Sequence, residues 1–200
     1  IRDIDWRMRY SGDESEVYAV NESAGGPGVE VAPSTLEVLR RGVHFSRLSG
    51  GRFDISIGPL VELWGIGKDA EGKVPPENEI EEALSLVDYT RVKVDGSRVS
   101  LDNPKMSVDL GGIAKGYAAD EVARVFAEAG VEHGLINLGG NVFAYGSKPD
   151  GSPWRIGVQN PLSNRGAYLG VLNVEDRAVV TSGPYERFFI QDGRRYHHIL

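Results

Sequence analysis

A pair of glycines between two different patterns of apolar residues most constrains how this chain folds. Residues 108–110 are short and apolar-rich, which predicts a buried strand that ends at Gly111-Gly112. From Ile113 the apolar residues recur at steps of three to five, which predicts a helix that stops at Gly130. A helix that starts at such a turn presents unpaired N–H groups and the positive end of its dipole, with Lys115 close by. The turn is therefore a candidate anion or phosphate site, with an ordinary strand–helix turn as the alternative.

Composition excludes several classes of function. The chain has 200 residues, which fits one domain, 1–200. No run approaches the roughly 20 apolar residues of a membrane span. The net charge of −7 argues against a general nucleic-acid binder, because phosphate contacts require a basic surface. There is no cysteine, so disulfides, thiolate metal sites and a cysteine nucleophile are all excluded.

The order of the expected elements favours an α+β fold, with helices in the first half and antiparallel strands in the second. Helices are expected at 1–10, 13–21, 34–49 (with a capping-box pattern at Ser34–Glu37) and 79–87. The apolar but glycine-rich residues 52–67 predict loops, and the polar residues 68–78 predict a surface excursion. Strands are expected at 91–94, 98–101, 135–145, 154–159, 168–174, 178–181, 188–191 and 195–200. Asp95-Gly96 and Asp192-Gly193 predict two hairpin turns.

Three local patterns could carry chemistry, each with a structural alternative. Asp54 lies in an apolar loop after two glycines, where it could be a carboxylate of a functional site or a structural aspartate of a turn. Residues 138–141 (Leu-Gly-Gly-Asn) could approach a ligand closely or form a β-bulge. His197 and His198 are adjacent in an expected strand, so they point to opposite faces and one of them could face a cleft. No Gly-x-Ser-x-Gly elbow is present, which leaves little support for a serine hydrolase.

Six longer motifs occur together in a characteristic order. They lie at residues 52–67, 108–120, 138–141, 148–157, 181–187 and 192–199. Together they resemble the ApbE family, the FAD:protein FMN transferases once called thiamine-biosynthesis lipoproteins. The resemblance runs almost end to end, from Arg9-Tyr10 to Ile199.

The resemblance implies an α+β, T-fold-like domain with an antiparallel or mixed sheet that binds FAD and Mg²⁺. Members of the family transfer FMN from FAD to a threonine hydroxyl of a partner flavoprotein subunit and release AMP. Some members instead hydrolyse FAD to FMN and AMP, and a flavin-binding protein without catalysis is a further alternative. The resemblance also implies the cell envelope or periplasm, with the membrane reached only through an N-terminal lipid anchor.

The resemblance assigns flavin and nucleotide contacts to matching positions of this chain. Tyr10 matches an aromatic residue that stacks on the flavin. The other matching positions are Phe53, Asp54 and Ile55 in a flavin-site loop, and Lys115 and Glu121 on a helix that contacts the nucleotide.

The resemblance also assigns the metal and the proton transfer. Ala118 matches a position whose backbone carbonyl binds the metal, His198 is a candidate acid or base, and Ile199 accompanies it. Pro184 replaces the aspartate that is usual in the family. We expect the chain to be a fragment without the family's first strand and its downstream metal-binding aspartate and threonine. One carbonyl oxygen would hold Mg²⁺ poorly, because Mg²⁺ demands near-octahedral oxygen ligation.

Overall fold

The computed structural model describes residues 1–66, 72–163, 166–185 and 187–200. Contacts divide the chain into two compact units, Ile1–Ala114 with Glu186–Leu200, and Lys115–Tyr185. The assignment of 1–200 to one domain stays a prediction. Among the described residues, no helix has the length and apolar character needed to cross a bilayer. The expected location in the cell envelope also stays a prediction.

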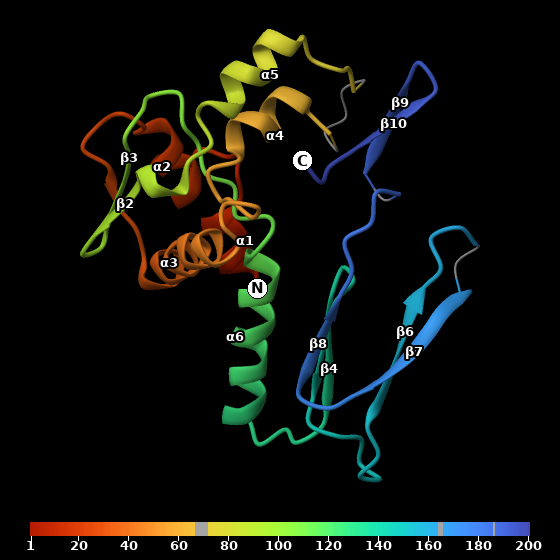
Figure 1. Cartoon of the computed structure of the whole chain (residues 1–200). Coiled ribbons are helices and arrows are strands. Elements are labelled where there is room, and N and C mark those ends of the chain that lie inside the picture. The colour runs from red at the N-terminus through yellow and green to blue at the C-terminus, as the bar shows by residue number, and fades with distance from the viewer. Residues whose placement is uncertain (67–71, 164–165, 186) are drawn as a thin grey trace. The chain divides into compact units, whose positions relative to one another are not determined.

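The first unit is mainly helical, and Figure 1 shows its helices in red to yellow-green and its C-terminal hairpin in blue. Its helices are α1 (Arg2–Met8), α2 (Glu16–Glu22), α3 (Pro33–Leu48), α4 (Gly58–Trp64), α5 (Glu77–Leu84) and the 3₁₀ turn η1 (Tyr89–Arg91). The helices expected at 1–10, 13–21, 34–49 and 79–87 are confirmed, and each observed end lies within three residues of the expected end. The capping box predicted at Ser34–Glu37 is wrong, because Ala32 is the N-cap and makes no side-chain cap bond. Pro33 opens this helix, since its fixed φ suits the first turn.

The part of the first unit that the structure describes also has two small antiparallel sheets. The strands β1 (Val29–Glu30), β3 (Arg98–Leu101) and β2 (Val92–Asp95) pair in that order. The hairpin of β9 (Phe188–Gln191) and β10 (Arg194–His197) forms the other sheet. Both hairpin turns predicted from an Asp-Gly pair are confirmed, since β2 pairs with β3 and β9 with β10.

In its described residues, the second unit contains one long helix and two further antiparallel sheets (Figure 1). Its elements are α6 (Ala114–Glu128), β4 (Gly134–Leu138), β5 (Asn141–Tyr145), β6 (Trp154–Gln159), β7 (Tyr168–Val174) and β8 (Arg177–Val180). The strands pair in the orders β4-β5-β8 and β6-β7. Gly139 and Gly140 have φ of 63° and 93° and form the β4–β5 turn. The single strand predicted at 135–145 is therefore wrong, and so is the β-bulge alternative at 138–141. The α+β class is confirmed.

The segment 106–110 is buried, but the strand predicted at 108–110 is wrong. Val108 donates its N–H to Oδ1 of Asn21 at 2.8 Å and accepts from Nδ2 of Asn21 at 3.1 Å. Asp109 donates its N–H to the carbonyl of Ile55 at 2.8 Å. A side-chain amide and a single carbonyl therefore satisfy groups that a neighbouring strand would otherwise bind. Val108 is fully buried, as its apolar character indicates.

Residues 52–67 contain a helix where the sequence predicts loops. In α4, Pro59 lies in the first turn, where its missing N–H costs no helical hydrogen bond. Gly65 ends the helix with a left-handed φ of 59°, a conformation that glycine adopts without steric cost. The glycines and the proline are therefore the start and stop signals of a short helix. Gly67 and the start of the predicted excursion lie outside the described residues.

The core of the first unit joins its helices to these irregular segments. The largest buried apolar side chains include Val17, Val20, Val38, Leu39, Ile55, Val99, Leu101, Met106, Val108 and Leu110. Ile55 is fully buried against α3, where a Cβ on Gly42 would lie 2.7 Å from its Cγ2. The loop before α4 is thereby anchored in the core.

We predict that Asn21→Ala destabilises the fold by about 1–3 kcal/mol, because it leaves both backbone groups of buried Val108 unpaired. Urea unfolding followed by circular dichroism measures the change. Asn173→Ala, at an exposed strand position, is the matched control and should have little effect. An Asn21→Ala protein as stable as the parent would contradict this account of the segment.

Candidate functional site

Tyr10 lies at the meeting point of three segments that are distant in the sequence. It follows α1, and its hydroxyl lies 3.1 Å from Oγ of Ser107 and 3.4 Å from Oε2 of Glu62 on α4. Ser107 is buried, whereas Tyr10 is half-buried. One arrangement satisfies all three groups: Ser107 donates to the phenol oxygen, and Tyr10 donates to the Glu62 carboxylate. The ring is thus held by its polar end.

A close approach between α4 and the segment 106–110 sets up this contact. Gly58 is buried at the start of α4, and a Cβ there would overlap Oγ and the carbonyl of Ser107. Only glycine lets the helix start this close to the segment. Glu62 comes one helical turn after Gly58, which brings its carboxylate to Tyr10.

The surroundings of Tyr10 raise the pKa of its phenol above the ordinary value of 10.0. Burial is the largest cause, because it disfavours the phenolate. The hydrogen bond with Ser107 opposes this rise, whereas the negative charges of Glu62 and Asp109 add to it. The residue is therefore a neutral aromatic ring, and not a base, at physiological pH.

In the loop 53–56, the Asp54 carboxylate accepts hydrogen bonds from the protein itself. Oδ1 of Asp54 accepts from the N–H and hydroxyl of Ser56 at 2.8 and 2.7 Å, and Oδ2 accepts from the N–H of Tyr89 at 3.0 Å. This is the turn aspartate that the sequence left as the alternative. The side chain of Ile55 is in the core. What this loop presents outward is the half-buried ring of Phe53, and a flavin contact there stays a prediction.

Phe53 packs against the glycine pair. A Cβ on Gly112 would lie 3.0 Å from Cε2 of Phe53, so the ring lies against the Gly112 backbone. A larger residue at position 112 would push the ring aside. The half-buried rings of Tyr10 and Phe53 thus each contact a part of the segment 106–112.

The turn before α6 has fewer free N–H groups than the sequence predicts. Gly111 donates to Oδ1 of Asp109 at 2.6 Å, and Ile113 and Ala114 donate to the carbonyl of Leu110 at 3.0 and 2.8 Å. The prediction of unpaired groups is therefore wrong for these three residues. An aspartate side chain and a tight turn take the donors that an anion would need.

The α6 positions lie on the second unit from Lys115 onward. Lys115 is exposed and Ala118 is buried. Glu121 accepts from Nη2 of Arg124 at 2.8 Å, in an ion pair that also joins Arg124 to Glu128. The nucleotide roles of Lys115 and Glu121 stay predictions.

The described residues do not fit a Mg²⁺ site by themselves. Within the described ranges, no group of three or more His, Asp or Glu side chains is placed to hold a metal ion. Ala118 can offer one backbone carbonyl oxygen, and Mg²⁺ requires about six oxygen ligands in octahedral geometry. The metal role of Ala118 stays a prediction.

His198 directly follows β10 and is held by the start of the same hairpin. Its N–H donates to the carbonyl of Arg187 at 3.1 Å, and its Nδ1 lies 3.4 Å from that oxygen. A proton on Nδ1 that is donated to this carbonyl leaves Nε2 with a free lone pair, the form of a general base. The next residue, Ile199, is exposed and donates its N–H to Nδ1 of His197 at 3.3 Å.

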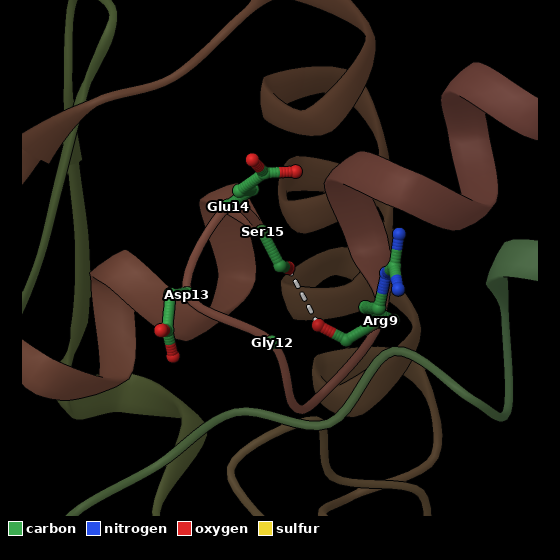
Figure 2. A pocket seen from close by; sticks show the side chains of 5 residues that line it. All are labelled: Arg9, Gly12, Asp13, Glu14 and Ser15. Carbon is green, nitrogen blue, oxygen red and sulfur yellow. Dashed lines mark hydrogen bonds between the residues drawn. The ribbon is translucent and has the colours of Figure 1, made fainter.

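The loop around Tyr10 also borders a cavity of about 320 Å³, which the sequence alone did not indicate. Figure 2 shows its lining residues, Arg9, Gly12, Asp13, Glu14 and Ser15. The buried hydroxyl of Ser15 donates to the carbonyl of Arg9 at 2.6 Å, drawn as a dashed line. The volume is at the small end of ligand sites. Its only sequence signal is a glycine before a serine N-cap, which is a common turn pattern.

Comparisons with known proteins extend over the whole chain. The model of the ApbE family matches residues 1–200. An FAD:protein FMN transferase of Klebsiella pneumoniae is 40% identical over 189 residues, covering 94% of this chain and 58% of the relative. One of Vibrio cholerae is 31% identical and covers all of this chain and 60% of the relative. The chain thus spans about three fifths of the length of these relatives.

Solved structures show the same similarity in three dimensions. The ApbE protein of Thermotoga maritima superposes with a TM-score of 0.92 at 37% identity, covering 99% of this chain and 64% of that one. The flavin transferase ApbE of Vibrio cholerae gives a TM-score of 0.84 at 31% identity, covering 98% and 63%.

We predict that the contribution of Tyr10 to stability falls at alkaline pH. Its raised pKa means that the folded state favours the protonated phenol, so the stabilisation is complete below about pH 10 and is lost as pH rises through the folded-state pKa. Denaturant unfolding of the parent and of Tyr10→Phe between about pH 8 and 11 measures this, with Tyr168→Phe at an exposed tyrosine as the control. The stability difference between parent and Tyr10→Phe should shift against the parent above pH 10. A difference that is independent of pH would contradict the prediction.

Proposed function

The chain belongs to the ApbE family, and we propose that it acts in the transfer of FMN from FAD to a threonine hydroxyl of a partner flavoprotein, with release of AMP. The activity named for its relatives supports this proposal. The observation within the structure that carries it is the ring of Tyr10, which Ser107 and Glu62 hold by its hydroxyl. A neutral ring that is fixed at one end suits stacking on a planar ligand.

The reaction needs a base and charge neutralisation. The threonine oxygen attacks the phosphorus on the FMN side, a new P–O bond forms, and the P–O bond to AMP breaks so that AMP leaves with its phosphate. The threonine proton passes to a base, for which we propose Nε2 of His198. We propose Lys115 as a cation for the pyrophosphate. The family resemblance also implies Mg²⁺, to which we assign no step.

The aromatic and apolar groups have binding roles in this proposal. Tyr10 and Phe53 contact the flavin ring, and Ile199 lies beside the base. The hydrogen bonds of Asp54 shape the loop that carries Phe53, so its contribution to flavin binding is indirect. Glu121 would have to exchange its ion pair with Arg124 for a nucleotide contact.

The test incubates the protein with FAD and a flavoprotein subunit that carries an acceptor threonine. We expect a covalent mass gain of one FMN on the subunit and an equal amount of AMP. FMN and AMP in solution without the mass gain would instead identify an FAD pyrophosphatase, with water in place of threonine. FAD binding without turnover would identify a flavin-binding protein and would contradict the transferase proposal.

A parallel incubation with EDTA tests the magnesium requirement that the family resemblance implies. Ala118 offers one carbonyl oxygen, so this requirement applies to a protein in which further oxygen ligands complete the metal site. In that protein we expect the chelator to abolish AMP release, because cleavage of a pyrophosphate benefits from a divalent ion that clamps its charge. Turnover that resists EDTA would reject the requirement for Mg²⁺.

We predict that Tyr10→Ala weakens FAD binding by about 2- to 12-fold, the equivalent of the roughly 0.5–1.5 kcal/mol of an aromatic stack. Fluorescence titration with FAD measures the affinity. Tyr10→Phe keeps the ring and loses the hydroxyl, so it should retain most of the affinity, and Tyr168→Phe is the control. Equal affinity of Tyr10→Ala and the parent would contradict the stacking role.

A further inference from the structure

An aromatic stack joins α4 to the β9–β10 hairpin within the first unit. The rings of Phe189 and Tyr196 stack with centroids 5.2 Å apart and planes at 19°. The ring of Trp64, the last residue of α4, lies 5.7 Å from Tyr196 and 6.4 Å from Phe189. Figure 1 shows the hairpin beside the end of α4. All three rings are half-buried.

The strand register places the stack on one face of the hairpin. Phe189 and Tyr196 are directly opposite each other, so their side chains lie on the same face, toward Trp64. Beside the stack, Oε1 of Gln191 accepts from the N–H of Val74 at 2.9 Å, and Gly72 packs against the ring of Phe189. The hairpin thus packs against α4 chiefly through its aromatic face.

The docked hairpin carries His198. Tyr196 comes two residues before it, and Arg187, whose carbonyl binds both the N–H and Nδ1 of His198, comes two residues before Phe189. His197 pairs with Phe188 in the ladder. His198 is therefore joined to both ends of the hairpin, through the chain to β10 and through hydrogen bonds to Arg187 before β9.

The same short helix also holds Tyr10. Glu62 accepts from the Tyr10 hydroxyl, and Trp64 is two positions further along α4. Residues two apart on a helix point about 200° apart, so α4 can contact the Tyr10 loop on one side and the hairpin on the other. One seven-residue helix thus connects the proposed flavin-stacking ring to the proposed base.

We propose that Trp64 is a positioning residue for FMN transfer, because it docks the β9–β10 hairpin on α4 and thereby gives the His198 imidazole a single position relative to Tyr10. This inference rests on the proposed function and on the role of His198 as the base. Trp64 itself touches neither the reacting atoms nor the proton. Its effect on the rate is therefore transmitted entirely through His198.

The first test measures position without catalysis. Trp64→Ala removes the ring, Trp64→Phe keeps an aromatic ring, and Trp154→Ala removes the same side chain from the second unit as the matched control. We expect faster amide hydrogen exchange in residues 188–199 and a shifted His198 imidazole signal in Trp64→Ala alone. The chain has four histidines, so comparison with His198→Ala identifies that signal. Unchanged exchange and an unchanged signal in Trp64→Ala would overturn the proposal.

The second test measures catalysis with FAD and the acceptor subunit. We expect kcat in Trp64→Ala to fall by about 10- to 100-fold with KM for FAD nearly unchanged, and Trp64→Phe to recover most of the rate. In a His198→Ala background, Trp64→Ala should cause no further loss. A full additional loss there, or an equal loss in Trp154→Ala, would show a general effect on stability and would overturn the positioning role.

The two tests separate failure of this inference from failure of the proposed function. If the parent protein transfers no FMN, the proposed function fails, and hydrogen exchange and the His198 signal still decide whether Trp64 holds the hairpin. If Trp64→Ala does not unfold cooperatively, Phe189→Leu replaces it, because this variant loosens the stack from the hairpin side and leaves α4 intact. The same exchange, signal and rate criteria then apply.

Discussion

The two hydrogen bonds between the Asn21 side chain and the backbone of Val108 hold the segment on which the rest of the first unit depends. Residues 106–110 are buried without a strand partner, so their polar groups require bonds from elsewhere. Once the segment is fixed, Ser107 reaches the Tyr10 hydroxyl and Asp109 reaches both the loop before α4 and the turn before α6. The Asn21 amide therefore makes the two backbone hydrogen bonds to Val108 that a neighbouring strand would otherwise make.

The candidate site follows from this packing. Its carboxylates in the first unit bind groups of the protein itself, since Asp54 and Asp109 accept from backbone N–H groups and Glu62 accepts from the Tyr10 hydroxyl. Among the residues that the structure describes, the groups of the first unit that suit a ligand include the half-buried rings of Tyr10 and Phe53 and the His198 imidazole, whose Nδ1 lies beside the Arg187 carbonyl. Such a set favours a planar aromatic ligand and proton transfer, in agreement with the flavin chemistry of the family.

Local chemistry was predictable where neighbours in the sequence determine it. The Asp-Gly turns of both hairpins and the stop of α6 at Gly130, where φ is 70°, rest on glycine conformations that few other residues adopt. The period of the apolar residues likewise predicted α6. The errors at 52–67 and 108–110 both arise because one local pattern is compatible with two structures. Glycine and proline mark helix ends as well as loops, and a buried extended segment looks like a strand whether or not another strand pairs with it.

The sequence by itself determined the family, the α+β class, most helices and both hairpins, because periodicity, turn residues and motif order are local properties that survive without coordinates. Only the tertiary structure decided that Tyr10 meets Ser107, 97 positions away, and that Trp64 meets Phe189 and Tyr196 across most of the chain. It also decided that Asp54 serves the backbone. The physical reason is that a hydrogen-bond partner or a stacked ring is chosen by burial and close approach between distant segments. No pattern among neighbouring residues encodes that choice.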